Sequence, residues 1–158
     1  MTNFLEQLAA EWYSYTDYFV RTNICLNPRP KGGWANELDV LAFSIARGEL
    51  IHLEASSDAD SWDERKKKFL TKKFVFSQLQ YENIVGAQIQ TIRKIALVGS
   101  VRKSKANLVW GQGIEVILVP SFIAIITANL ATKDPMKAAV PEGFPRLRAM
   151  QFALAYGA

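Results

Sequence analysis

The clearest pattern of hydrophobic positions lies in the first third of the chain, where two apolar runs, 38–45 and 50–53, flank a short segment containing Gly48. Runs rich in Val, Leu, Ile and Phe on either side of a glycine predict a β-hairpin. Alternate side chains of a strand share one face of the sheet. If the faces of the two strands coincide, the carboxylates of Asp39 and Glu54 converge on one side.

The spacing of apolar and polar residues predicts further helices and strands over the rest of the chain. Ser61 and Glu64 match a capping box, which marks the start of a helix. Pro120 suits the first turn of a later helix that runs to about residue 130. The other predicted elements are a helix over 3–20, a strand within 18–26, a loop over 27–33, a short helix over 78–90 that closes at Gly86, strands over 92–101 and 114–119, and an amphipathic segment over 146–156.

Composition indicates one domain spanning residues 1–158, because a chain of this length with 49% hydrophobic residues can bury one core. The single cysteine, Cys25, excludes an internal disulfide. Glu6 and Glu11 interrupt the N-terminal segment where a signal peptide would need an apolar run, so we expect a cytoplasmic protein with no membrane partner. The net charge of +4 permits contact with a polyanion without requiring it.

Two ionised carboxylates brought together in a half-buried sheet repel each other, and one takes up a proton unless a cation lies between them. Hard oxygen ligands of this kind suit Mg²⁺ or Mn²⁺. Asp39 and Glu54 are therefore candidate ligands of a divalent metal ion.

Asp39 on one strand, fourteen intervening residues and Glu54 on the second hairpin strand resemble the motif of the PD-(D/E)xK, or restriction-endonuclease-like, nuclease superfamily. The resemblance implies that both acids bind Mg or Mn, and that a lysine two residues after the Glu orients or activates the attacking water. Here Ser56 stands at the lysine position. The predicted order of elements over about 3–101 agrees with the family's αβββαβ core, an α/β fold with a mixed central sheet flanked by helices. The remaining strand and helices would form a C-terminal extension.

In this superfamily the lysine can move to the helix that follows the hairpin. The helix predicted from residue 62 places Lys66 and Lys73 on the row that should face the sheet, and a lysine there can bury its stem while its amine reaches a polar pocket. We expect Lys73 to be the displaced catalytic lysine. Related nucleases also carry a metal-binding Glu on the helix before the first strand, and Glu11 is the better candidate, with Glu6 second.

Several basic and aromatic residues near the predicted site could contact nucleic acid. Arg29 and Lys31 lie in the loop that leads into the hairpin, Lys66 lies on the basic helix, and Trp34 could stack on a base or simply cover the core. The only histidine, His52, shares a strand face with Glu54. It would either act at the metal site or pack as a hydrogen-bonded core residue.

The resemblance implies a metal-dependent nuclease that hydrolyses DNA phosphodiester bonds, with DNA as its partner and Mg or Mn as its cofactor. The alternative is a catalytically degenerate nucleic-acid-binding or assembly module of the same fold, its motif lysine lost at Ser56. A small-molecule enzyme of another class has no motif in its favour. A homodimer formed through the apolar C-terminal elements is a further expectation.

Overall fold

The computed structural model describes residues 3–56, 60–99 and 109–157. The described chain contains both strands and helices, as the hydrophobic pattern predicts. In chain order the elements are α1 (Phe4–Tyr15), β1 (Phe19–Pro28), β2 (Trp34–Ser44), β3 (Glu49–Ser56), α2 (Trp62–Lys68), the π-helical turn η1 (Phe69–Lys73), α3 (Gln78–Val85), β4 (Thr91–Val98), β5 (Val109–Trp110), the 3₁₀ turn η2 (Gly111–Gly113), β6 (Ile114–Leu118), α4 (Val119–Leu130) and α5 (Pro145–Tyr156).

The strands form one open, mixed, six-stranded sheet in the order β1-β2-β3-β4-β6-β5. β1, β2 and β3 pair antiparallel, as hairpin connections require. β4 joins β3 in parallel, β6 joins β4 in parallel, and the short β5 closes the far edge antiparallel. The protein therefore has an α/β fold in which an antiparallel half and a parallel half of the sheet meet at β3.

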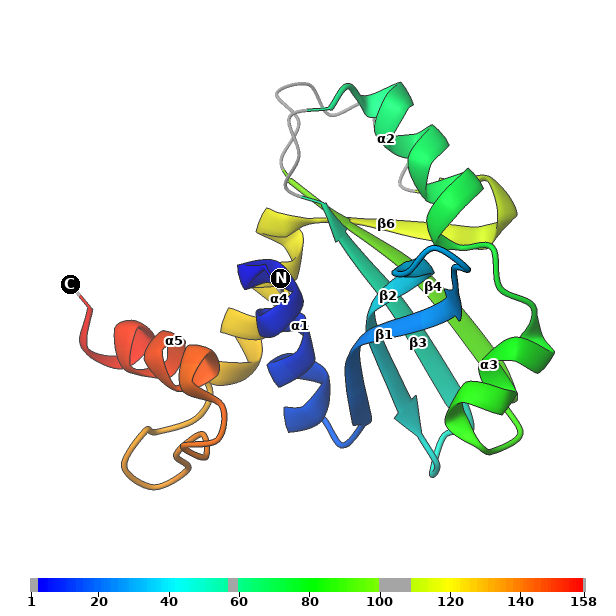
Figure 1. Ribbon diagram of the computed structural model, residues 1–158. Helices are drawn as coiled ribbons and strands as arrows, with labels where there is room; N and C mark the ends of the chain where they lie inside the picture. The colour runs from blue at the N-terminus through cyan, green and yellow to red at the C-terminus, as the bar shows by residue number, and fades with distance from the viewer. Residues whose placement is uncertain (1–2, 57–59, 100–108, 158) are drawn as a thin grey trace.

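Helices cover both faces of this sheet (Figure 1). On one face α1 and α4 pack on alternate residues of the central strands, among them Val40, Ala42 and Ile51, and α5 packs against α1 and α4. On the other face, Leu41 and Leu50 belong to an apolar cluster that includes residues of α3. This second face also carries Asp39 and Glu54, since each lies an even number of residues from a neighbour in that cluster.

Most of the predicted elements are confirmed. The hairpin formed by β2 and β3 turns at Gly48, which adopts φ 57°. Ser61 caps α2 by the predicted capping box with Glu64. α3 ends at Gly86, which adopts the left-handed conformation expected of a C-terminal glycine.

Two boundaries in the N-terminal third differ from the prediction. The first helix ends at Tyr15 instead of near residue 20, because Thr16 leaves the helical conformation and Asp17 adopts φ 68°. The Thr16 hydroxyl donates to the Trp12 carbonyl at this end of the helix. The predicted loop over 27–33 is also shorter, since β1 continues to Pro28, which pairs with β2. Proline is tolerated at this place because β1 is an edge strand, where a missing N–H donor costs little.

The two-residue strand β5 was not predicted, since two residues carry no periodicity. Residues 100–101, at the end of the strand predicted over 92–101, lie outside the described part of the chain. Within the described ranges, no helix is long and apolar enough to cross a membrane.

Candidate functional site

The candidate site lies where β2 and β3 separate. The two strands pair from Ser44 opposite Glu49 up to Val40 opposite Leu53. Beyond that pair, β2 continues alongside β1 only, while β3 continues alongside β4. The backbone ladder between β2 and β3 therefore stops immediately before the two acids, and their side chains fall in the fork between the strands.

Each acid bonds to a backbone N–H at this fork. The Asp39 N–H donates to Glu54 Oε1 at 3.2 Å, and the Ala55 N–H donates to Asp39 Oδ2 at 3.1 Å. Glu54 is fully buried and Asp39 is 8% exposed. The two carboxylates thus compensate for the ladder bonds that are lost where the strands part, which fixes their positions to the backbone itself.

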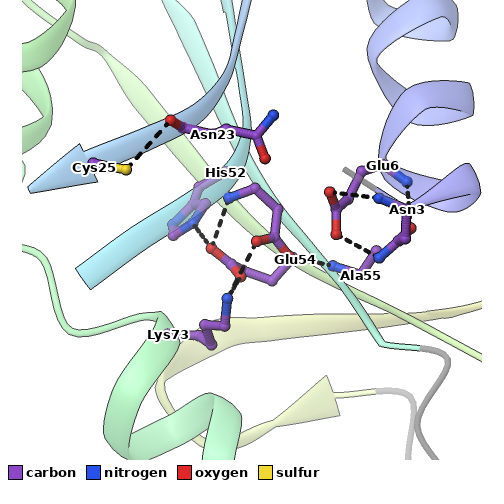
Figure 2. Close-up of polar contacts among 9 residues, drawn as sticks. Asn3, Glu6, Asn23, Cys25, His52, Glu54, Ala55 and Lys73 are labelled. Atoms are coloured by element: carbon purple, nitrogen blue, oxygen red, sulfur yellow. Dashed lines mark hydrogen bonds and ion pairs between the residues drawn. The ribbon is translucent and has the colours of Figure 1, made fainter. Parts of the chain in front are cut away.

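Lys73 reaches both carboxylates from the turn that follows α2. Its Nζ lies 3.2 Å from Asp39 Oδ1 and 2.6 Å from Glu54 Oε2. Figure 2 shows this amine directed at the Glu54 carboxylate. The π-helical turn η1 sets the position of Lys73, because the Phe74 N–H bonds to the Phe69 carbonyl and both phenylalanines are buried in one cluster beneath it. The structure therefore brings Asp39, Glu54 and Lys73 together.

Burial dominates the electrostatics of this group. Desolvation, reinforced by the charge of Glu54, raises the pKa of Asp39 to about 6. Burial also raises the pKa of Glu54. Burial alone would lower the pKa of Lys73, but the charges of Glu54 and Asp39 outweigh it, and the lysine pKa is raised. Lys73 therefore keeps its proton at neutral pH, and Asp39 takes up a proton as the pH falls below about 6.

The donor set fits a hard divalent cation that keeps most of its water. Within residues 3–56, 60–99 and 109–157, no group of three or more His, Cys, Asp or Glu side chains could hold a metal ion. Mg²⁺, however, is commonly bound through one or two carboxylates with water completing its shell. Glu54 Oε2 is buried and, although Lys73 lies close, has no aligned hydrogen-bond donor. Asp39 and Glu54 can therefore supply two oxygen ligands once the flexible amine moves aside.

Glu11, the preferred third ligand from sequence, is not brought to this group. Its carboxylate accepts bonds from the backbone N–H groups of Arg146 and Leu147, at 2.9 and 3.2 Å, and pairs with the Arg146 guanidinium at 2.7 Å. It therefore anchors the start of α5 on α1. This role depends on a contact between residues 135 positions apart, which helical spacing does not indicate.

Glu6, the second choice, lies closer to the acids. It is 7% exposed, and its pKa is raised by burial and next by the charge of Asp39. Its carboxylate also bonds to the backbone and side chain of Asn3 in the capping box of α1. Figure 2 shows Glu6 and Asn3 directed at each other. The charge of Asp39 therefore reaches Glu6 on α1.

The residues predicted to contact nucleic acid are exposed or half-buried, and within the described part of the chain no hydrogen bond or ion pair joins them to Asp39, Glu54 or Lys73. Arg29 and Lys31 are exposed in the turn between β1 and β2, and Trp34, at the start of β2, is 51% exposed. Lys66 is half-buried on α2. Ser56, at the position of the motif lysine, is 4% exposed at the end of β3.

His52 is hydrogen-bonded at both ring nitrogens and is fully buried. Its Nε2 lies 2.7 Å from Glu54 Oε1, and its Nδ1 lies 2.7 Å from the hydroxyl of Tyr81 on α3. Burial lowers the pKa of His52 to about 3, so the ring is neutral. The second of the two alternatives, a packed and hydrogen-bonded histidine, is the one this geometry favours. Sequence reasoning missed Tyr81, since nothing in the pattern of α3 distinguishes it from a core aromatic residue.

Neither a scan against protein-family models nor a search of curated proteins finds a match to this chain.

Proposed function

We propose that this protein is a metal-dependent nuclease with a restriction-endonuclease-like core, which hydrolyses DNA phosphodiester bonds. One observation carries the proposal: Asp39, Glu54 and Lys73 converge at the fork between β2 and β3, with the lysine supplied by the segment after α2. The element order α1-β1-β2-β3-α2-η1-α3-β4 is compatible with that core, with α3 as an additional helix before β4. The absence of a lysine at Ser56 is then a displacement of the amine and not a loss.

In this proposal Asp39 and Glu54 hold Mg²⁺ or Mn²⁺, which when bound polarises the phosphate and lowers the pKa of a coordinated water. Because its pKa is raised, Lys73 stays protonated at neutral pH. It therefore acts as a donor that orients the attacking water and stabilises the charge that develops on the phosphate, and not as a proton acceptor. Its side chain is 26% exposed, so the amine has a route from the carboxylates toward a phosphate.

DNA would approach over the exposed turn between β1 and β2 and over the basic helix α2. Arg29, Lys31 and Lys66 would neutralise backbone phosphates, and Trp34 would stack on a base or a sugar. Contacts of this kind position the nucleic acid without reading its sequence, and they weaken as the salt concentration rises.

One observation favours a second candidate function, the non-catalytic binding or assembly module. The Lys73 ammonium lies within 3.2 Å of both acids, so it offsets their charge without any metal ion. In this reading the three residues close the fork of the sheet, and the basic surface binds nucleic acid without cutting it.

A cleavage assay separates the two candidates. Linear, single-stranded and branched DNA would be incubated with Mn²⁺ or Mg²⁺ and the wild-type protein, Asp39→Asn or Glu37→Gln. Glu37 is the matched control, because it is an exposed acid on the same strand. The nuclease proposal expects metal-dependent cutting by wild type and Glu37→Gln but not by Asp39→Asn. Equal DNA binding by all three proteins without any cutting would favour the binding module.

A further inference from the structure

A chain of hydrogen bonds runs behind Glu54, on the side away from Lys73. It links the hydroxyl of Tyr81, the two nitrogens of His52 and Glu54 Oε1, and both of its links measure 2.7 Å. All three side chains are fully buried. Figure 2 shows the His52 ring and Lys73 on opposite sides of the Glu54 carboxylate.

The proton positions along this chain follow from the chemistry of its members. A carboxylate that holds a cation is ionised and can only accept hydrogen bonds, so in the proposed metal-binding form His52 must donate to Glu54 through Nε2–H. A neutral imidazole carries a single N–H, which leaves Nδ1 as an acceptor for the Tyr81 hydroxyl. The chain therefore has one direction, from the Tyr81 hydroxyl through the imidazole to Glu54 Oε1.

The imidazole is held in place by aromatic rings. Phe74 lies edge-on to the His52 ring at 4.8 Å between centroids, Tyr81 at 5.6 Å and Phe76 at 6.3 Å. Phe74 directly follows Lys73 in the chain. One short segment thus places the amine on one side of the Glu54 carboxylate and supports the imidazole on the other.

The two oxygens of Glu54 consequently differ. Oε1 accepts from His52 and from the Asp39 N–H, whereas Oε2 faces Lys73 without an aligned donor. Partners of this kind behind a ligating group orient it, and their loss commonly weakens metal binding about 10- to 100-fold.

We propose that His52 and Tyr81 are positioning residues, which hold Glu54 Oε1 so that Oε2 alone is presented to the divalent cation. This inference rests on the proposed function, since it assigns a role at the same site. Neither residue touches the cation or the substrate.

Three variants test the inference through Mn²⁺ binding, measured by calorimetry on the complete protein without DNA. His52→Leu removes the donor to Glu54. His52→Gln keeps an N–H near the position of Nε2 but changes the ring, and Tyr81→Phe removes only the distal hydroxyl. Thermal unfolding would establish that each variant is folded at the titration temperature. The imidazole nitrogen shifts in an NMR spectrum of wild type report the tautomer independently of metal.

We expect the Nε2–H tautomer, a loss of Mn²⁺ affinity of about tenfold or more in His52→Leu, a loss of only about threefold in His52→Gln, and an intermediate loss in Tyr81→Phe. Equal losses in the leucine and glutamine variants would overturn the inference, because ring packing and not the donated bond would then matter. Wild-type binding that all three variants retain would overturn it while the proposed function stands. A wild type that neither binds Mn²⁺ nor cuts DNA would overturn both.

Discussion

Replacing Asp39 with asparagine should stabilise the folded protein at alkaline pH, although it removes a residue of the proposed site. Asp39 is buried beside a second carboxylate, and its pKa is raised from the ordinary value of 3.8 to about 6. The folded state therefore binds the Asp39 proton more tightly than the unfolded state does. It follows that the free energy of unfolding falls as the pH rises from about 4 to above 6.

The size of this effect follows from the shift. About two pKa units at 1.36 kcal/mol each correspond to about 3 kcal/mol of stability lost when Asp39 ionises in the fold. Asparagine has nearly the same shape as the protonated acid and can still accept the Ala55 N–H. The attraction between ionised Asp39 and Lys73 is already part of the pKa of about 6, so it is not subtracted again. The free energy of unfolding of Asp39→Asn should therefore exceed that of wild type by about 3 kcal/mol at pH 8, and should nearly equal it at pH 4.

Urea denaturation followed by tryptophan fluorescence at pH 4, 6 and 8 measures the difference. Glu37→Gln is the control, because Glu37 is exposed on the same strand and its loss should leave the free energy of unfolding unchanged within about 0.5 kcal/mol at each pH. A lower stability of Asp39→Asn than of wild type at pH 8, or a difference that does not depend on pH, would refute the reasoning about burial.

Three further predictions concern individual residues of the site and its surroundings. Lys73→Met should reduce DNA cleavage about 100-fold, as loss of one stabilising donor does. The control is Lys137→Met, which should cut normally because Lys137 is exposed between α4 and α5. Comparable cutting by both variants would exclude Lys73 from catalysis. Glu11→Gln should lower the free energy of unfolding by about 1 to 3 kcal/mol, because the start of α5 loses the charge and one of the two acceptor oxygens that bind it. The calorimetric Mn²⁺ affinity should not change; a loss of Mn²⁺ binding in the folded variant would restore Glu11 as a ligand. Trp34→Ala should weaken single-stranded DNA binding by about 1 kcal/mol, or roughly fivefold in a fluorescence titration. Phe19→Ala should not weaken it, although Phe19, at the start of β1, is 70% exposed. Equal weakening by both variants would show a general effect of exposed aromatic residues.

The local elements could be predicted from the sequence, and so could the possibility that Asp39 and Glu54 meet on one face of the sheet. Strand periodicity is two residues, so once residues 38–45 and 50–53 are assigned to adjacent strands, only the relative register decides whether Asp39 and Glu54 meet. The capping box at Ser61 and the glycine at the end of α3 are local signals, since a few neighbouring residues satisfy them.

The sequence predicted only in part that Lys73, and not Lys66, reaches the two acids. Helical spacing places both lysines on the row that faces the sheet, but it assumes a uniform helix. The actual segment changes to a π-helical turn at Phe69, which places Lys73 at the carboxylates. A single-turn change of this kind depends on how Phe69 and Phe74 pack in the core, and this packing is a tertiary contact.

The sequence by itself determined most of the elements, their order, and the face of its own strand on which each of Asp39 and Glu54 lies, because these follow from the spacing of neighbouring residues. Only the tertiary structure decided which distant residues meet those acids. Glu11 bonds to α5 instead of the site, and His52 bonds to Tyr81 across 29 residues. Contacts of this range depend on how helices pack on the two faces of the sheet, and local periodicity carries no information about that packing.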